Sequence, residues 1–149
     1  MLPGNRNSPF SSYQNPQARL KSRLFELAGS NSNSDDIIKL LDDNPSFDVN
    51  SALDNDGRTA LMTATQFDCP DTVKTLIEKG ADIKHRGNLG YQAVHYACRA
   101  GSLEALQSLI QEDRSVIQET CGDVKTPLHL AAHFGNLNIV KLLTQQGAD

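Results

Sequence analysis

Two histidines in the last third of the chain, His129 and His133, have a spacing that is typical of a metal site. Residues four apart lie on one face of a helix, and His-x-x-x-His pairs occur in zinc sites. Structural zinc takes four nitrogen or sulfur ligands, and catalytic zinc takes three ligands from the protein. No third residue of suitable type and spacing accompanies this pair. We therefore expect no metal ion here.

The cysteines Cys69, Cys98 and Cys121 are an odd set without a C-x-x-C pair. This pattern is typical of reduced thiols in a cytoplasmic or nuclear protein. A nucleophilic cysteine needs a base beside it, and the sequence fixes no histidine next to these thiols. We expect Cys98 to be a core residue and Cys121, in a loop before a helix, to be more exposed. Glycine-rich phosphate-binding motifs are missing too, so the sequence predicts neither an enzyme nor a cofactor.

Composition narrows the partner classes. The chain has 149 residues, of which 14 are basic and 18 acidic, giving a net charge of -4. This balance does not favour nucleic acid. No apolar stretch approaches the about 20 residues that a membrane span needs, so we expect no membrane partner. The length suits one domain or a short array.

The first residues differ from the rest in composition. Arg6, Arg19, Lys21 and Arg23 precede the first acidic residue, and the segment is rich in Pro, Asn, Ser and Gln. Such a segment lacks the apolar residues needed to offset its ordering entropy. We expect residues 1–19 to form a disordered basic tail.

A repeat of about 33 residues governs the remainder of the chain. Residues 54–65, 90–101 and 126–135 align in register, with Thr59, Gln92 and Thr126 as equivalent positions. The tripeptide Gly-Ala-Asp at 80–82 recurs at 147–149. Self-similarity at this period predicts a stack of similar structural units.

Each unit has the pattern of two helices. Thr126 followed by Pro127 is typical of a helix start, because the hydroxyl caps the first turn and proline suits the first helical position. Leu128 and Ala131 share one face of that helix. Gly135 then ends the helix in a left-handed conformation, for which Asp68 is the substitute in the first unit. A second apolar helix follows in every unit.

These residues resemble ankyrin repeats. The sequence T-P-L-H-L-A-A at 126–132, Gly135 and Gly-Ala-Asp at 147–149 carry the resemblance, which covers residues 54–149. It implies an all-α solenoid of stacked helix-turn-helix units with hairpin-like tips. The predicted organisation is a disordered basic tail at 1–19, a degenerate N-terminal capping repeat at 20–53, ankyrin repeats at 54–86 and 87–120, and a repeat at 121–149 that is truncated at its C-terminal end.

The sequence departs from the ankyrin pattern at several positions. Gln92 replaces the capping threonine of the middle unit, and Val124 stands where a turn glycine is typical. The loop that starts at Asp113 carries an added residue, so we expect it to be irregular. The chain also stops directly after a second helix, which indicates a fragment of a longer protein.

The resemblance also implies a binding surface, because ankyrin-like stacks hold protein partners on a concave face formed by the tips and the ends of the first helices. Carried over by position, this face comprises Asn55, Asp56 and Arg58 in the first tip, Asn88, Leu89 and Tyr91 in the second, Gly122, Asp123 and Lys125 in the third, and Gln66, Phe67, Arg99, Ala100, His133 and Phe134 at the helix ends. We expect Phe67, Arg99 and Phe134, taken as equivalent, to form one row. The alternative is that the two phenylalanines only cover helix ends.

The function implied by this resemblance is non-catalytic protein binding, as a scaffold, adaptor or inhibitor. One alternative is the recognition domain of a longer enzyme, channel, transcription regulator or ubiquitin-ligase adaptor. Another is a bacterial effector that acts in a host cell. We expect a protein partner, no cofactor, a cytoplasmic or nuclear location and a monomeric fragment.

Overall fold

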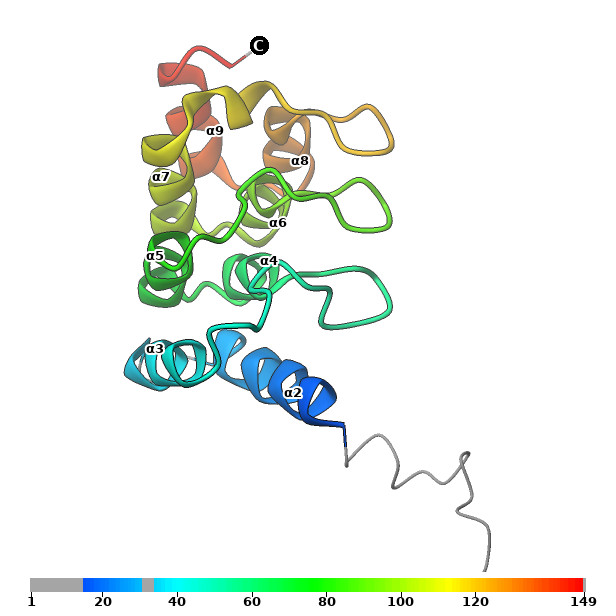
Figure 1. Ribbon diagram of the computed structural model, residues 1–149. Coiled ribbons are helices and arrows are strands. Elements are labelled where there is room, and N and C mark those ends of the chain that lie inside the picture. The colour runs from blue at the N-terminus through cyan, green and yellow to red at the C-terminus, as the bar shows by residue number, and fades with distance from the viewer. Residues whose placement is uncertain (1–14, 31–33, 149) are drawn as a thin grey trace, which may run out of the picture.

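The computed structural model describes residues 15–30 and 34–148, and all regular elements in these ranges are helices (Figure 1). They are α2 (Pro16–Ala28), α3 (Ser34–Asp43), α4 (Ala60–Gln66), α5 (Pro70–Glu78), α6 (Ala93–Ala100), α7 (Leu103–Glu112), the 3-10 helix η1 (Arg114–Gln118), α8 (Pro127–His133) and α9 (Leu137–Gln145). The even-numbered helices form one layer and α3, α5, α7 and α9 the other, while three loops project from the even-numbered layer as tips (Figure 1). The predicted all-α solenoid is confirmed.

Small side chains let the inner helices pack closely. α4 packs against α6, and α6 packs against α8. The fully buried alanines on these helices are Ala60, Ala64, Ala93, Ala97 and Ala131. The outer helices add larger core residues, among them Val73, Leu76, Leu106, Leu109 and Leu143. Because each helix pair buries its apolar face only against its neighbours, the core runs along the whole stack.

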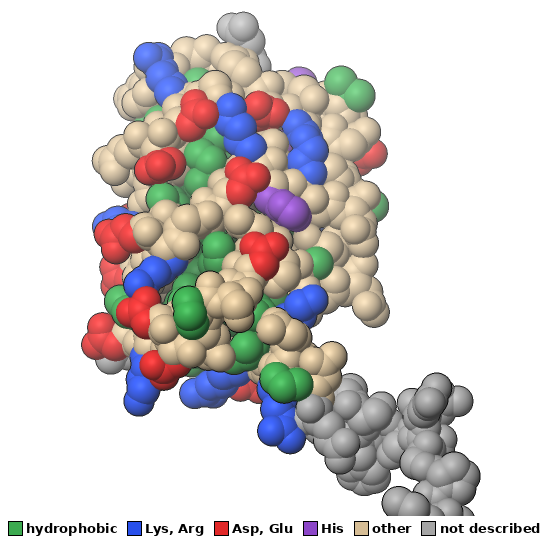
Figure 2. Space-filling model, in the orientation of Figure 1, with side chains coloured by type: hydrophobic (Ala, Val, Ile, Leu, Met, Phe, Trp, Pro, Cys, Tyr) green, Lys and Arg blue, Asp and Glu red, His purple; other side chains and the backbone are tan. Residues whose placement is uncertain are grey.

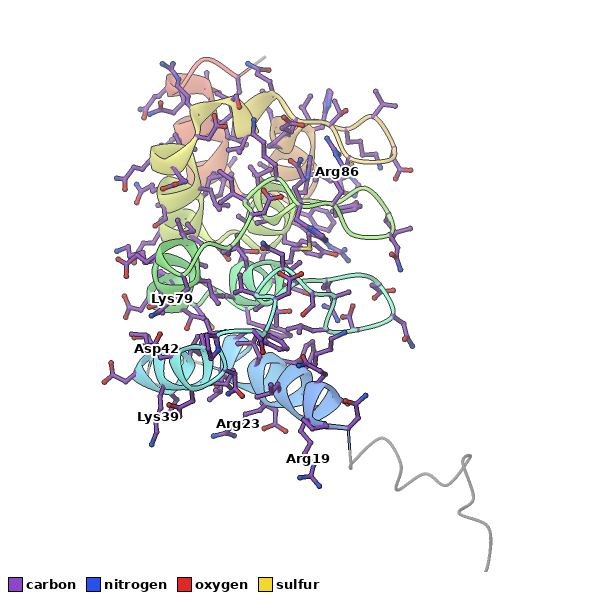
Figure 3. The ribbon with its side chains drawn as sticks, viewed as in Figure 1. Arg19, Arg23, Lys39, Asp42, Lys79 and Arg86 are labelled. Carbon is purple, nitrogen blue, oxygen red and sulfur yellow. The ribbon has the colours of Figure 1, made fainter. Side chains whose placement is uncertain are left out.

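The first helix pair closes the stack at its N-terminal end. α2 packs against α4, and α3 packs against α5. Lys79, which follows α5, donates to Asp42 of α3 at 2.6 Å (Figure 3). Arg23 and Lys39 point away from the body of the protein at this end (Figure 3). This polar outer surface suits a terminal unit of a repeat protein.

Histidines tie the tips to the inner helices. Thr126 caps α8, its Oγ1 accepting from the His129 N–H at 3.3 Å, and the His129 Nδ1 accepts the Thr126 N–H at 3.1 Å. In the middle unit, His95 Nδ1 accepts the Gln92 N–H at 3.0 Å, and His95 Nε2 donates to the Glu119 carbonyl at 2.9 Å. Both histidines therefore have a structural role, because they hold the segment between tip and helix through hydrogen bonds.

The start of α2 corrects the boundary expected for the tail. The helix begins at Pro16 rather than after residue 19. Asn15 accepts the Gln17 N–H at 3.0 Å, and Pro16 occupies the first helical position. Asn15 and Pro16 are a local signal for a helix start, and a prediction based on the composition of the whole segment overlooks it. The rest of the predicted tail, residues 1–14, lies outside the described residues.

The sequence predicted an irregular loop after α7, and this prediction is wrong, because the segment forms the 3-10 helix η1. Asp113 accepts the Ser115 N–H at 2.9 Å at its start. Val116 and Ile117 are buried, and η1 packs against α7 and α8. Burial of these two apolar side chains explains why the added residue forms a helical turn.

All three cysteines are free and buried. Cys98 lies in the core as predicted, and burial raises the pKa of its thiol to about 12. The expectation for Cys121 is wrong, because only 4% of this residue is exposed. Its backbone N–H donates to the Lys125 carbonyl at 3.0 Å, so it lies at the base of the third tip. Burial suppresses the thiolate form of Cys98, which argues against a nucleophilic role for this thiol.

Left-handed backbone occurs where α4 ends and in each of the three tips. Asp68, with φ of 56°, ends the first inner helix in this conformation, as expected of an aspartate there. Gly57 and Gly90 have φ of 73° and 75° in the first two tips, and Val124 has φ of 60° at the equivalent place in the third. A β-branched residue is strained in this region.

We expect Val124→Gly to stabilise the protein by about 1 kcal/mol, because glycine adopts this backbone conformation without steric cost. Val124 is exposed, so the change removes little buried surface. Urea unfolding at neutral pH measures the difference. Gly90→Ala, at the equivalent position, is the matched control and should destabilise. An unchanged or lower stability of Val124→Gly would contradict the strain argument.

We expect the buried His95 to make stability fall in mild acid. Burial lowers its pKa below the ordinary value of 6.5, and its Nδ1 already accepts a hydrogen bond. The unfolded chain binds a proton at the ordinary pKa, so the stabilisation is complete above about pH 6.5 and is lost as the pH falls below that value. Urea unfolding from about pH 7.5 to 5 measures it.

The controls for this pH dependence are two histidine variants. His95→Gln should show a smaller loss of stability between neutral and mildly acidic pH, whereas His133→Gln, at an exposed position, should retain the full loss. Equal pH dependence in His95→Gln and the unmodified chain would assign the effect to other groups.

Candidate binding surface

Three short loops form the tips of the solenoid, at residues 53–58, 87–91 and 121–125. Each is closed by a hydrogen bond from its first N–H to its last carbonyl, at 2.8, 2.9 and 3.0 Å respectively. The first tip is one residue longer than the others. All three project from the same side of the inner layer (Figure 1).

Hydrogen bonds join the tips into one row. The Asn88 N–H donates to the Asp56 carbonyl at 2.9 Å, and the Asn88 side chain donates to the Asn55 carbonyl. The Gly122 N–H donates to the Leu89 carbonyl at 3.2 Å. Leu89 nevertheless keeps 68% of its surface exposed. The row of tips therefore exposes the apolar side chain of Leu89 on a backbone that hydrogen bonds keep in place.

The ends of the inner helices correct the predicted register. The equivalent pairs are Gln66–Phe67, Arg99–Ala100 and His133–Phe134. Phe67 and Phe134 cap α4 and α8, but their counterpart in α6 is Ala100, and Arg99 lies one position earlier. Phe67, Arg99 and Phe134 are therefore not one equivalent row. The two phenylalanines are 52% and 46% exposed, respectively.

Arg99 meets Phe134 through a cation–π contact instead. Its guanidinium carbon lies 5.5 Å from the centroid of the Phe134 ring. The His133 ring meets the same phenylalanine edge-on, with the centroids 4.9 Å apart. Three predicted residues thus form a single exposed cluster across α6 and α8.

Arg58 has a different environment from the one its position in a tip indicated. Its side chain forms an ion pair with Asp54 at 2.5 Å, donates to the Gln66 side chain, and lies 5.9 Å from the Phe25 ring centroid. Burial alone would raise the pKa of Asp54, but the backbone and side-chain hydrogen bonds from Arg58 hold it below its ordinary value. Arg58 therefore joins the first tip to α4 and α2.

Among the other tip residues, Tyr91 packs against neighbouring rings, whereas Asp123 and Lys125 are exposed. The Tyr91 ring packs against His95 and Tyr96, with centroids 5.8 and 5.5 Å apart. Asp123 and Lys125 are exposed, and their charged groups lie 3.8 Å apart. Tyr91 thus anchors the second tip, while the charged pair lies in the third.

The described residues contain no group of three or more histidine, cysteine, aspartate or glutamate side chains that could hold a metal ion. Nδ1 of His129 already accepts a hydrogen bond from Thr126. In the same ranges no helix is long and apolar enough to cross a bilayer.

Comparison with known proteins decides the family. A family model for ankyrin repeats, in three copies, matches residues 21–87 and 84–149. The chain belongs to the ankyrin repeat family. Ankyrin repeats are protein-interaction modules, and the fold is non-catalytic.

Similar ankyrin segments occur in much longer proteins. The chain is 35% identical to the tyrosine-protein kinase HTK16 of Hydra vulgaris over 130 residues, which are 86% of this chain and 17% of the kinase. It is 34% identical to the human BCL-6 corepressor-like protein 1 over 96 residues, 64% of this chain and 5% of that protein. It is 30% identical to the Drosophila melanogaster Neurogenic locus Notch protein over 102 residues, 68% of this chain and 4% of that protein.

Polar side chains that the sequence analysis missed align consecutive ankyrin repeats. Ser102 Oγ donates to the Thr65 carbonyl at 2.6 Å. The Asn136 amide donates to the carbonyls of Cys98 and Arg99 at 2.7 and 3.2 Å. Ser102 and Asn136 occupy equivalent positions after the left-handed turn, and this recurrence was the available signal. These three bonds fix the ends of the inner helices that form the candidate surface.

We expect Gly122→Ala to destabilise the ankyrin stack by more than about 1 kcal/mol, because its Cβ would collide with the Leu89 carbonyl oxygen. The change also breaks the hydrogen bond between the second and third tips. Gly29→Ala is a control, since its Cβ would meet neighbours only at 3.4 Å or more. Thermal unfolding and amide exchange of residue 122 report the effect, and equal stability of both variants would contradict it.

Proposed function

We propose that this ankyrin domain binds a protein partner along the surface formed by its tips and inner helix ends. The observation that supports this most directly is the exposure of Phe67, Phe134 and Leu89 on a hydrogen-bonded framework. Half-exposed aromatic side chains are typical anchors of protein interfaces. A backbone that is already ordered also lowers the entropy cost of binding.

The outer face has a different character. Acidic and basic side chains are interspersed on the face seen in Figure 2, and residues after the outer helices form ion pairs such as Lys79–Asp42 and Arg86–Glu119. Exposed ion pairs of this kind contribute little energy, which is typical of a solvated surface. This contrast favours the tip side as the binding face.

We also propose that the domain is the recognition part of a longer protein. The chain spans less than a fifth of each of the three relatives described above. In such a protein it would act as a scaffold or adaptor for a catalytic or regulatory region. Its three buried, free thiols support a reducing location, the cytoplasm or nucleus.

We expect Phe67→Ala and Phe134→Ala each to weaken partner binding by about 2 kcal/mol, because truncating an aromatic interface anchor costs about this much. The outer-face variants Lys74→Ala, Glu104→Ala and Lys141→Ala should each cost well under about 1 kcal/mol. A partner obtained by affinity purification and then purified allows calorimetric titration of all five variants.

Melting temperatures of the same variants separate binding from packing. If the phenylalanine variants only lower the melting temperature and keep their affinity, these rings cover helix ends and do not bind. If the outer-face variants abolish binding while the phenylalanine variants bind normally, the binding face has been assigned to the wrong side.

A further inference from the structure

We propose that the surface carries a carboxylate-binding site centred on Arg99, and that its occupant is an acidic peptide segment of the partner. The segment presents an aspartate or glutamate to Arg99 and an apolar side chain to the neighbouring helix end. This inference rests on the proposed function and specifies the chemistry of the partner.

Arg99 has a free hydrogen-bonding edge. It is exposed in the last turn of α6, and among the described residues its guanidinium group forms neither an ion pair nor a hydrogen bond. Its contact with the Phe134 ring restricts the planar group without using its N–H donors. A guanidinium held in this way is suited to bidentate binding of a carboxylate.

Arg58 is an arginine of the same fold whose guanidinium group has acceptors for its hydrogen bonds. It also has an aromatic neighbour, Phe25, but Asp54 and Gln66 accept its hydrogen bonds. Arg99 has the aromatic contact without the acceptors. The position equivalent to Arg99 is Gln66 in the first repeat and His133 in the third, so among these three described repeats the middle one has the arginine.

An apolar site lies next to this cation. Ala100 is exposed, and the equivalent residues in the flanking repeats are the half-exposed Phe67 and Phe134. Packed helices are about 10 Å apart, and the small side chain of Ala100 lies at the position between those of the two phenylalanines. An extended peptide advances about 3.3 Å per residue, which places its apolar residue within about three positions of its carboxylate.

Charge favours a peptide over a nucleic acid at this site. The tips carry Asp56 and Asp123, both exposed, and the chain has a net charge of -4. A polyphosphate chain would meet these acids, and nucleic-acid binding depends on several cations that each neutralise a phosphate. One open arginine matches a segment with a single carboxylate, because Asp56 and Asp123 would repel further negative charge.

The test begins with selection from a displayed library of random 12-residue peptides on the purified chain. We expect the enriched peptides to contain an aspartate or glutamate within three positions of an apolar residue. One enriched peptide, labelled with a fluorophore, is then titrated by anisotropy. Arg99→Gln should weaken its binding about tenfold, and Arg99→Lys by a smaller factor, since lysine keeps the charge but loses the planar fork.

Matched changes identify the contact. Lys74→Gln removes the same charge from α5 and should alter the affinity less than about twofold. Replacing the acidic residue of the peptide by its amide should weaken binding to the unmodified chain about tenfold and binding to Arg99→Gln hardly at all. Melting temperatures check that every variant is folded.

Several outcomes would overturn the carboxylate site. These are a selection that yields no peptide or no excess of acidic residues, an equal effect of the amide peptide on the unmodified chain and on Arg99→Gln, and displacement of the peptide by a single-stranded oligonucleotide at lower concentration than by unlabelled peptide. If Phe67→Ala and Phe134→Ala weaken partner binding while Arg99→Gln does not, the proposed function stands and only this inference fails. If neither phenylalanine variant matters, the proposed function fails too.

Discussion

The apolar face of each helix pair cannot be buried within one repeat, and the whole architecture follows from this constraint. α4, α6 and α8 approach closely because their facing residues, such as Ala64, Ala97 and Ala131, are alanines with no exposed surface. Close packing holds consecutive repeats at one spacing and in one orientation. Once that register exists, every position in one repeat has a fixed neighbour in the next. The positions of the tips, the helix ends and the polar contacts between repeats follow from this packing.

Polar groups then convert the stack into a precise framework. The amide of Asn136 and the hydroxyl of Ser102 each bond to backbone carbonyls of the preceding inner helix, about one repeat away in the sequence. Gly122 allows the third tip to bond to the second, because any side chain there would meet the Leu89 carbonyl. Ser102 is fully buried, and a buried donor is costly when unpaired, so its bond opposes slippage between repeats. The candidate surface therefore has an ordered backbone before a partner arrives.

Small differences between equivalent positions give this regular framework its chemistry. Gln66, Arg99 and His133 occupy one position in three repeats, yet they accept a hydrogen bond, stack on a ring and meet that ring edge-on, respectively. The repeat supplies the spacing, and the residue type decides whether a position serves the fold or remains open. A scaffold of this kind does not determine its ligand, which is chosen by the side chains placed on it.

The sequence by itself determined the features that depend on neighbouring residues. Thr126 and Pro127 start a helix, Asp68 ends one, and the recurrence of these signals about every 33 residues indicated the all-α stack before any contact was known. Tertiary structure alone decided the burial of Cys121 beneath its tip and the stacking of Arg99 on Phe134. It also decided the contact between the Arg58 guanidinium and the ring of Phe25. The physical reason is sequence separation: Arg99 and Phe134, like Arg58 and Phe25, become neighbours only when whole repeats pack, and no local pattern encodes which side chain will lie across that interface.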